Sequence, residues 1–361
     1  MNVRGRIGLQ QRVLPDYRVG FFDGLAARCP DGLTVAAGEP RPAEEIMSAA
    51  GLGAARWERL RNVHLLAGPV YLCLQPGLRR WLEAWDPRVL IVEANPRYLS
   101  NWGAAAWMRA RGRPVVGWGL GAPGVEGPAK FVWQAWARRL DGAIAYSRRG
   151  AAEFARAGLS QERVWIAPNA VSAAPGPIAR REPTAERAAR VIYVGRLQAR
   201  KRVDLLLEAA ASLDPPPEVW IVGDGPARKD LEGKATSLKV HSRFYGSLQG
   251  AALEALLDEA DLFVLPGTGG LAVQQAMARG LPVIAAEGDG TQEDLVSPEN
   301  GWLVPPGDGR ALAESLREAL ADPRRLRVMG EASHRLARER FNLDAMVDVF
   351  VRALYEIGGG V

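Results

Sequence analysis

Two cations follow directly on a buried strand in the second half of this 361-residue chain. The mostly apolar run at residues 190–194 predicts a strand, and Gly195, Arg196 and Lys201 lie between it and the next helix. A guanidinium and an ammonium at one strand end are suited to holding a diphosphate. If that diphosphate is a leaving group, both cations also stabilise the charge of the transition state. The alternative is two solvated surface cations on a loop.

Two glycine-containing turns follow other expected strands. Gly223 and Gly225 come after the strand at 218–222, where they allow the backbone to approach a ligand or a neighbouring helix closely. The full G-x-G-x-x-G pattern is missing there and after every other expected strand, so a nicotinamide oxidoreductase is the least favoured hypothesis.

A third strand, at 262–265, runs into a glycine-rich loop that contains Gly269 and Gly270. A helix is expected to begin at Leu271. The free amides at its start and the helix dipole form an anion site with no side chain in the way.

In the first half, the candidate residues follow the first expected strand, at 6–10. Arg12, Tyr17 and Arg18 lie on the loop after it, where the arginines could receive a phosphate of a lipid-linked acceptor. The alternative is a capped, solvated loop.

Strands and helices alternate along the whole chain, which predicts two doubly wound parallel α/β sheets with ligands at the carboxyl ends of the strands, in a cleft between the domains. We expect an N-terminal domain at 1–172, a Pro/Ala/Arg-rich linker at 173–189, a second domain at 190–338 and a closing helix within 339–361. The other expected strands are 33–36, 63–66, 89–93, 114–117, 142–146, 240–245 and 282–285. The expected helices are 18–27, 75–84, 101–111, 130–140, 203–213, 227–238, 251–259, 271–278 and 309–320.

Charge and tryptophan are unequally distributed between the halves. Through Pro175 there are 23 Lys and Arg against 14 Asp and Glu, and beyond it 23 against 27, which gives +9 and −4. Nine of the eleven tryptophans lie in the first half, and the pairs Trp81/Trp85 and Trp133/Trp136 have helical spacing beside several arginines. Such a mixture suits an anionic membrane surface or an acidic lipid-linked acceptor. The alternative is an aromatic core surrounded by solvated arginine.

The second half resembles the donor domain of the family 4 glycosyltransferases. The motifs that carry the resemblance are VGRL at 194–197 with Lys201, VGDGP at 222–226, GLAVQQAMARGLPVIA at 270–285 and NGWLVPPGD at 300–308. The resemblance implies a GT-B fold, a nucleotide-diphosphate sugar as donor, and retention of configuration without a bound metal or other cofactor. It also implies that Arg196 and Lys201 hold the donor diphosphate, which the amides of Gly269, Gly270 and Leu271 cap.

The chain departs from the family pattern at two places. The family usually has two glutamates eight residues apart; Gln275 occupies the second position, and the first has no counterpart. Gln275 can still hydrogen-bond a ribose hydroxyl, without the strength of a charged carboxylate. Many members also have a histidine after the strand near Val116, where this chain has a glycine-rich loop. Trp118 in that loop could form a floor on which a sugar stacks, or could simply pack.

The working hypothesis is therefore a retaining glycosyltransferase acting on a lipid-linked or cell-envelope glycan. A non-catalytic GT-B-like scaffold that binds a nucleotide or glycan and partners another transferase is the main alternative, and a nucleotide-sugar epimerase lacks candidate acid/base carboxylates.

With no signal peptide and no run of 18 apolar residues, we expect a cytoplasmic protein, with peripheral contact to the inner face of a membrane as an option. Cys29 and Cys73 are expected to be buried thiols, the three scattered histidines predict no metal site, and no nucleic-acid recognition module is present.

Overall fold

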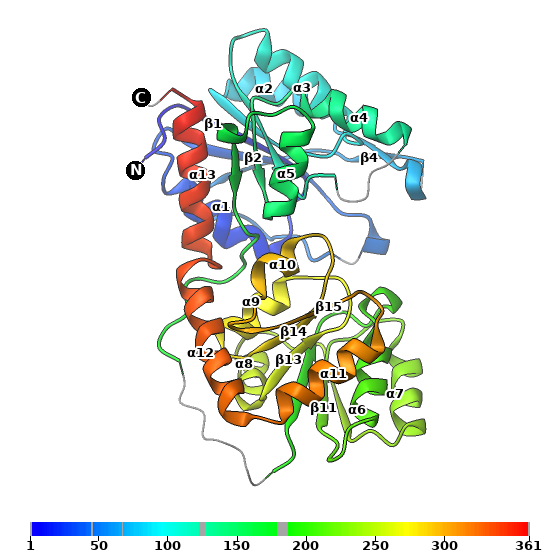
Figure 1. Ribbon diagram of the computed structural model, residues 1–361. Helices are drawn as coiled ribbons and strands as arrows, with labels where there is room; N and C mark the ends of the chain where they lie inside the picture. The colour runs from blue at the N-terminus through cyan, green and yellow to red at the C-terminus, as the bar shows by residue number, and fades with distance from the viewer. Residues whose placement is uncertain (1, 45, 67, 123–126, 179–186, 360–361) are drawn as a thin grey trace. The chain divides into compact units, whose positions relative to one another are not determined.

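A computed structural model describes residues 2–44, 46–66, 68–122, 127–178 and 187–359. The chain divides into two compact units (Figure 1). The first comprises Met1–Val171 together with Leu343–Val361, and the second comprises Ser172–Asn342. Much of the predicted linker, 179–186, lies outside the described residues.

The first unit is built on a seven-stranded parallel sheet with the order β3-β2-β1-β6-β7-β8-β9. The chain moves outward from β1 to β2 and β3 and then returns to the other side of β1, so the sheet has a switch point between β1 and β6. Its central strands have both faces covered, which is why they are continuous apolar runs. The strands are β1 (Ile7–Val13), β2 (Leu33–Gly38), β3 (Arg56–Arg59), β6 (Val89–Glu93), β7 (Val115–Gly119), β8 (Gly142–Ala145) and β9 (Val164–Ile166).

Helices cover both faces of this sheet. On one face, α1 (Val19–Ala26) packs against α13 (Leu343–Ile357), the closing helix, which begins four residues after the expected boundary. The other face carries α2 (Leu78–Trp85), α3 (Leu99–Arg109), α4 (Pro128–Ala137) and α5 (Arg148–Arg156). Trp81 of α2 and Trp133 and Trp136 of α4 are buried and belong to the core on this side of the sheet. For these three tryptophans, the aromatic-core alternative is therefore the one that holds.

One predicted strand of the first half does not join the sheet. Residues 63–66 were expected to add a strand, but β4 (Val63–Leu65) pairs antiparallel with β5 (Leu72–Leu74) in a separate two-stranded hairpin. The three residues of β4 are half-buried or exposed, so this strand lacks the buried faces of the strands in the main sheet. Short 3₁₀ helices are η1 (Asp16–Arg18), η2 (Pro42–Glu44), η3 (Gly68–Val70), η4 (Gln161–Arg163) and η5 (Ala199–Lys201).

The second unit has a six-stranded parallel sheet with the order β12-β11-β10-β13-β14-β15. Its first strand in sequence, β10, is again central, and the switch point lies between β10 and β13. The strands are β10 (Arg190–Val194), β11 (Glu218–Val222), β12 (Ser242–Gly246), β13 (Leu262–Leu265), β14 (Val283–Ala286) and β15 (Gly301–Val304). The helices are α6 (Val203–Ala211), α7 (Arg228–Ser237), α8 (Gly250–Glu259), α9 (Leu271–Ala278), α10 (Thr291–Leu295), α11 (Gly309–Leu320) and α12 (Pro323–Glu339).

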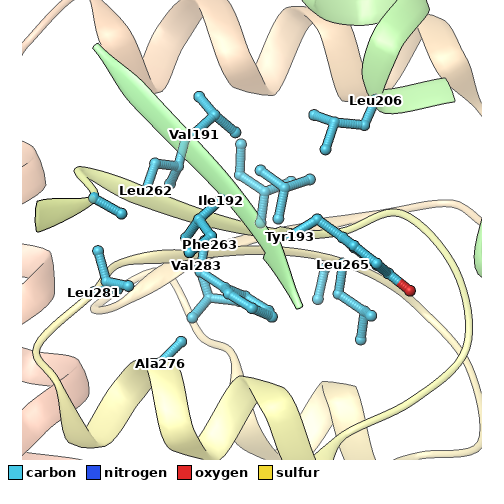
Figure 2. Close-up of a cluster of buried hydrophobic side chains, with 14 of the residues drawn as sticks. Val191, Ile192, Tyr193, Leu206, Leu262, Phe263, Leu265, Ala276, Leu281 and Val283 are labelled. Atoms are coloured by element: carbon cyan, nitrogen blue, oxygen red, sulfur yellow. The ribbon is translucent and has the colours of Figure 1, made fainter. Parts of the chain in front are cut away.

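The core of the second unit lies around β10 (Figure 2). Val191 and Ile192 are fully buried there, and Phe263 of β13 and Ala276 of α9 pack in the same cluster. Burial of this strand fixes where its carboxyl end lies, and with it the residues that follow. None of the described helices is long and apolar enough to cross a membrane.

Candidate functional site

The loops after β10, β11 and β13 meet at the carboxyl edge of the second sheet. β10 lies between the other two strands, and its neighbour β13 lies across the switch point. In open parallel sheets, ligands bind outside the carboxyl ends of the strands at this point. The structure therefore brings most of the predicted donor residues to the edge where a ligand is expected.

The glycines after β10 and β11 allow two loops to touch. The Gly195 amide donates to the Val222 carbonyl at 2.9 Å, and the Leu197 amide donates to the Asp224 carbonyl at 2.8 Å. A Cβ on Gly223 would overlap the Gly195 carbonyl, and Gly223 has a φ of +136°. Gly225 has a φ of +153°, and a Cβ on it would lie 2.4 Å from the Leu197 carbonyl oxygen. These two glycines are thus required by neighbouring backbone, whether or not a ligand also approaches them.

Lys201 lies against the glycine-rich loop that follows β13. Its Nζ donates to the Thr268 carbonyl, and a Cβ on Gly269 would lie 2.7 Å from this Nζ. The neighbouring Arg200 donates from Nη1 to Thr268 Oγ1 at 2.9 Å. Burial, and then the charge of Arg200, lower the pKa of Lys201 to about 8, while Asp289 opposes the shift. The loops that follow β10 and β13 are therefore joined through the half-buried ammonium of Lys201.

Arg196 comes directly after Gly195 and is half-buried. Its carbonyl accepts a hydrogen bond from the hydroxyl of Tyr193, a fully buried residue of β10, at 3.2 Å. The contact fixes the backbone of Arg196 relative to the strand. Arg196 thus shares the carboxyl edge with Lys201, as the sequence predicts from their positions.

The start of α9 presents backbone amides at the same edge. Gly270 precedes Leu271 as the N-cap, and no side chain caps the helix. The first amides of a helix have no partner within the helix. The carbonyl of Gly269 accepts a hydrogen bond from Nε2 of Gln292, which is fully buried in α10. Sequence reasoning missed Gln292, whose only signal is a lone glutamine in the polar turn after β14.

Gln275 lines a pocket of about 410 Å³ together with residues of α8 and of the segment 172–178. Other lining residues are Leu253, Leu257 and an ion pair between Arg279 and Asp258. Lys201 and the glycine-rich loop do not line this pocket, and the assignment of Gln275 to the donor site stays a prediction.

In the first unit, Arg12 is committed to carboxylates. β1 extends to Val13, so Arg12 lies on the strand rather than on a loop. Its Nη1 donates to Glu44 Oε2 at 2.8 Å, and its backbone amide donates to Glu93 Oε2 at 2.9 Å. Burial acts against the charge of Arg12, but the hydrogen bond to Glu44 and nearby negative groups keep its pKa above the ordinary value. Arg12 therefore lies on β1 and not on the expected loop, while its role toward an acceptor phosphate stays a prediction.

Arg18 is a buried cation, not a solvated one. It is only 8% exposed, its Nη2 donates to the Tyr146 hydroxyl at 2.9 Å, and its guanidinium lies 4.3 Å from the Trp118 ring centroid. Tyr17 is 42% exposed, and the centroid of its ring is 5.7 Å from the guanidinium. Tyr17, Arg18 and Trp118 are thus brought together at the carboxyl ends of β1 and β7.

Trp118 is part of the core. It is fully buried, with its ring centroid 5.2 Å from that of Phe21 and 5.0 Å from that of Phe350. Arg18 lies over the same ring. The ring therefore offers no surface to a sugar, and of the two sequence-based alternatives for Trp118, a stacking floor or simple packing, the structure supports packing.

Within the part of the chain that the structure describes, no group of three or more His, Cys, Asp or Glu side chains could hold a metal ion. Cys29 and Cys73 are buried free thiols.

Residues 177–336 match the family model described as Glycosyl transferases group 1. The chain is 36% identical over 149 residues to the sulfoquinovosyl transferase SQD2 of Arabidopsis thaliana, an alignment that covers 40% of this chain and 29% of that protein. It is 29% identical over 167 residues to the lipopolysaccharide core biosynthesis glycosyltransferase LpsE of Rhizobium meliloti, covering 45% of this chain and 49% of that protein. The chain thus spans less than half the length of these curated relatives.

Solved structures match over nearly the whole chain. The Anabaena protein HepE in complex with UDP has a TM-score of 0.72 at 19% identity, with 99% of this chain and 100% of that chain covered. Sucrose-phosphate synthase from Thermosynechococcus elongatus has a TM-score of 0.72 at 20% identity, with the same coverage. The chain has the GT-B fold. Its two Rossmann-like domains are the two units described above, and the predicted fold class is confirmed. The matched family model does not specify family 4, so membership of that GT-B family stays a prediction.

Proposed function

We propose that this GT-B protein is a glycosyltransferase that moves a sugar from a nucleotide-diphosphate sugar to a glycan acceptor. The observation that carries the proposal is the contact between Lys201 and the glycine-rich loop at the switch point of the second unit. The carboxyl edge of this sheet carries the ammonium of Lys201, the N-terminus of α9 and the backbone of Arg196. Relatives named as glycosyltransferases, and the Anabaena neighbour in complex with UDP, support a nucleotide sugar as donor.

The chemistry we propose is stabilisation of a leaving diphosphate. Arg196 and Lys201 would neutralise the charge that develops as the bond between the sugar and the diphosphate breaks, and the amides at Gly269, Gly270 and Leu271 would cap the phosphate oxygens. A bound diphosphate favours the charged form of Lys201 and so opposes the lowered pKa of the free protein. These groups could provide the stabilisation without a metal ion, so we propose a metal-independent reaction with no other cofactor.

We further propose that the configuration of the transferred sugar is retained. The acceptor hydroxyl would attack from the face that the diphosphate leaves, and the departing phosphate oxygen would take the proton of that hydroxyl. This route needs no protein carboxylate as general base. It also accommodates a chain in which Gln275 occupies the position of a glutamate.

The acceptor side of the proposal is a lipid-linked or cell-envelope glycan. Relatives with names of this kind include LpsE and a phosphatidyl-myo-inositol mannosyltransferase of Mycobacterium leprae, 34% identical over 134 residues. Helices α2 to α4 carry a basic outer face, which would let the protein contact an anionic membrane from the cytoplasmic side. The residues of this face are Arg79, Arg80, Arg109, Arg111, Lys130, Arg138 and Arg139, all of them exposed.

A non-catalytic scaffold is the second candidate. Gln275 motivates it, because its amide lacks the charge of the glutamate that is usual at this position in the family. A scaffold would bind a nucleoside diphosphate without cleaving a nucleotide sugar.

Release of free nucleoside diphosphate from UDP-, GDP-, ADP- and dTDP-sugars, with and without lipid-linked glycan acceptors, separates the two. We expect one donor to be turned over, with kcat falling about 10²–10³-fold in Lys201→Ala and Arg196→Ala. Lys229→Ala, a change at an exposed lysine of α7, is the matched control and should retain full turnover. Unchanged turnover in both site variants would refute the site, and binding without turnover would support the scaffold.

A further inference from the structure

The first unit contains an arginine whose charge has no carboxylate partner. Arg18 is buried at the start of α1, and the groups that act on its charge are the tyrosines Tyr146 and Tyr17. Among the described residues, no carboxylate forms an ion pair with it, and its Nη1 is buried without a hydrogen-bond partner. Glu93, the nearby acid that influences Tyr146, is engaged by the Arg12 amide and the Tyr98 hydroxyl.

Such an arrangement is costly unless something else neutralises the charge. Removing an ion from water costs several kcal/mol, and an unmade hydrogen bond of a buried donor adds to that cost. The cation–π contact with Trp118 and the hydrogen bond to Tyr146 offset only part of this free-energy cost. Buried donors without a partner call for an explanation, and an absent ligand is one of the few available.

A second unpartnered donor lies on the same side of the sheet. Gln11 is 5% exposed, and its Nε2 is buried without a partner. Because side chains alternate along a strand, Gln11 shares the face of Ile7 and Leu9, which belongs to the same core cluster as Trp118. Gln11 and Arg18 both lie at the carboxyl end of β1, next to the switch point with β6. Two independent donors are therefore left unsatisfied where this sheet is expected to bind its ligand.

We propose that Arg18 is the centre of an anion site that receives an oxyanion, a phosphate or a carboxylate, of the acceptor. The planar guanidinium matches both groups, and Nη1 supplies the free donor. The guanidinium lies 4.3 Å from the Trp118 ring centroid and 5.7 Å from that of the partly exposed Tyr17. The assignment to the acceptor rests on the proposed function, whereas the anion site itself does not. The acceptor class that follows is an acidic glycan or a glycan carried on a phosphate.

Inorganic phosphate and glucuronate are the probes that distinguish the two sources, titrated against the full chain by calorimetry at matched ionic strength. All proteins carry Lys201→Ala, so that the cation of the glycine-rich loop does not contribute. We expect one probe to bind, with a Kd that rises at least tenfold in Arg18→Met and severalfold in Arg18→Lys, which keeps the charge and provides a folded variant if methionine is not tolerated. Arg310→Met, a change at a side chain that is 89% exposed, is the control and should bind as tightly as the parent.

Binding of phosphate would identify a phosphorylated acceptor, and binding of glucuronate a carboxylated one. No binding of either probe, or equal binding in the Arg18 variants and the parent, would overturn the anion site. A separate titration of UDP against the chain with Lys201 intact tests the donor site. Its failure would contradict the proposed function without affecting an Arg18-dependent Kd for phosphate.

Discussion

Lys201 is subject to opposing electrostatic influences. Burial and the neighbouring Arg200 disfavour its charged form, Asp289 favours it, and the resulting pKa is about 8. Its ammonium donates a hydrogen bond to the Thr268 carbonyl, a neutral acceptor that an anionic ligand can outcompete. The side chain is therefore a cation held near the glycine-rich loop, and no carboxylate among the described residues is hydrogen-bonded to it. A diphosphate-binding residue needs this state before its ligand arrives.

The lowered pKa of Lys201 predicts a pH dependence of nucleotide binding. Below pH 8 the free protein carries the ammonium and can bind the diphosphate; above pH 8 the amine is neutral and this attraction is lost. We expect the Kd for UDP to rise about tenfold between pH 7 and 9, because one proton is then required for binding. Lys201→Arg stays charged throughout and should remove this rise. Calorimetric titrations that show the same pH profile for both proteins would contradict the assignment.

At the scale of single residues, the sequence predicted where a residue lies in the fold better than it predicted the residue's burial and contacts. Lys201 and Gly269 each follow a recognisable strand, so their meeting at one sheet edge could be expected. The burial of Arg18 could not be expected, because an arginine after Pro-Asp-Tyr resembles a loop residue. The side chains that surround it, Trp118 and Tyr146, come from distant parts of the sequence. Gln292 contacts Gly269 across 23 residues, and no local pattern signals such a bond. For Trp118 the sequence left stacking and packing open, because it does not show that Phe21 of α1 and Phe350 of α13 pack against the ring.

At the scale of elements, the two loops after β10 and β11 depend on glycine backbone geometry. Gly223 has a positive φ and no room for a Cβ beside the Gly195 carbonyl, whereas Gly233 in α7 has nothing within 4 Å of an added Cβ. The contrast gives an internally controlled test, since the same substitution meets opposite surroundings at the two positions.

We therefore expect Gly223→Ala to lower the free energy of unfolding by about 2 kcal/mol or more, through strain and displacement of the loop that carries Arg196. Gly233→Ala should raise it by about 0.5–1 kcal/mol, because alanine is the better helix former at an exposed position. Urea unfolding followed by circular dichroism measures both. An unchanged midpoint for Gly223→Ala would show that the contact between the two loops is not needed for stability.

The buried strands were predictable because a parallel sheet covered on both faces requires continuous apolar runs, as in β6, β11 and β13. β3 escaped prediction because its sequence, Arg-Trp-Glu-Arg, is charged and mostly exposed at the sheet edge. The edge strands β9 and β15 were missed as well; each is only partly buried, unlike the fully buried β13 of the same length as β15. The hairpin of β4 and β5 shows the converse error, in which a short apolar run pairs outside the main sheet.

At the scale of the whole molecule, part of the positive charge of the first half gathers on the outer face of α2 to α4. Arg139 lies over the Trp102 ring at 5.2 Å, Arg111 lies over the Trp107 ring at 3.9 Å, and Arg109 donates to the Arg138 carbonyl at 3.3 Å. The Arg139 and Arg109 contacts join α3 to α4, and the guanidinium of Arg79, 6.0 Å from the Trp107 ring centroid, joins α2 to α3. The surface that results is defined here by its seven basic residues named above. Phe131 and Val132 of α4 are 74% and 51% exposed beside it.

This basic face predicts binding to anionic membranes. The full chain should sediment with vesicles that contain phosphatidylglycerol, bind weakly to pure phosphatidylcholine, and dissociate as the salt concentration rises. Reversing Arg138 and Arg139 to glutamate should reduce binding strongly, whereas reversing Arg310 and Arg324 of the second unit should not. Equal sedimentation of the two variants would contradict a role for this face.

The central claim, a nucleotide-diphosphate site at the switch point of the second unit, is tested most directly by thermal unfolding in the presence of UDP, GDP, ADP or dTDP. We expect one of these nucleotides at millimolar concentration to raise the melting temperature by several degrees, and Lys201→Ala to abolish the rise while Lys229→Ala preserves it. No rise with any of the four, or a rise that persists fully in Lys201→Ala, would contradict the claim.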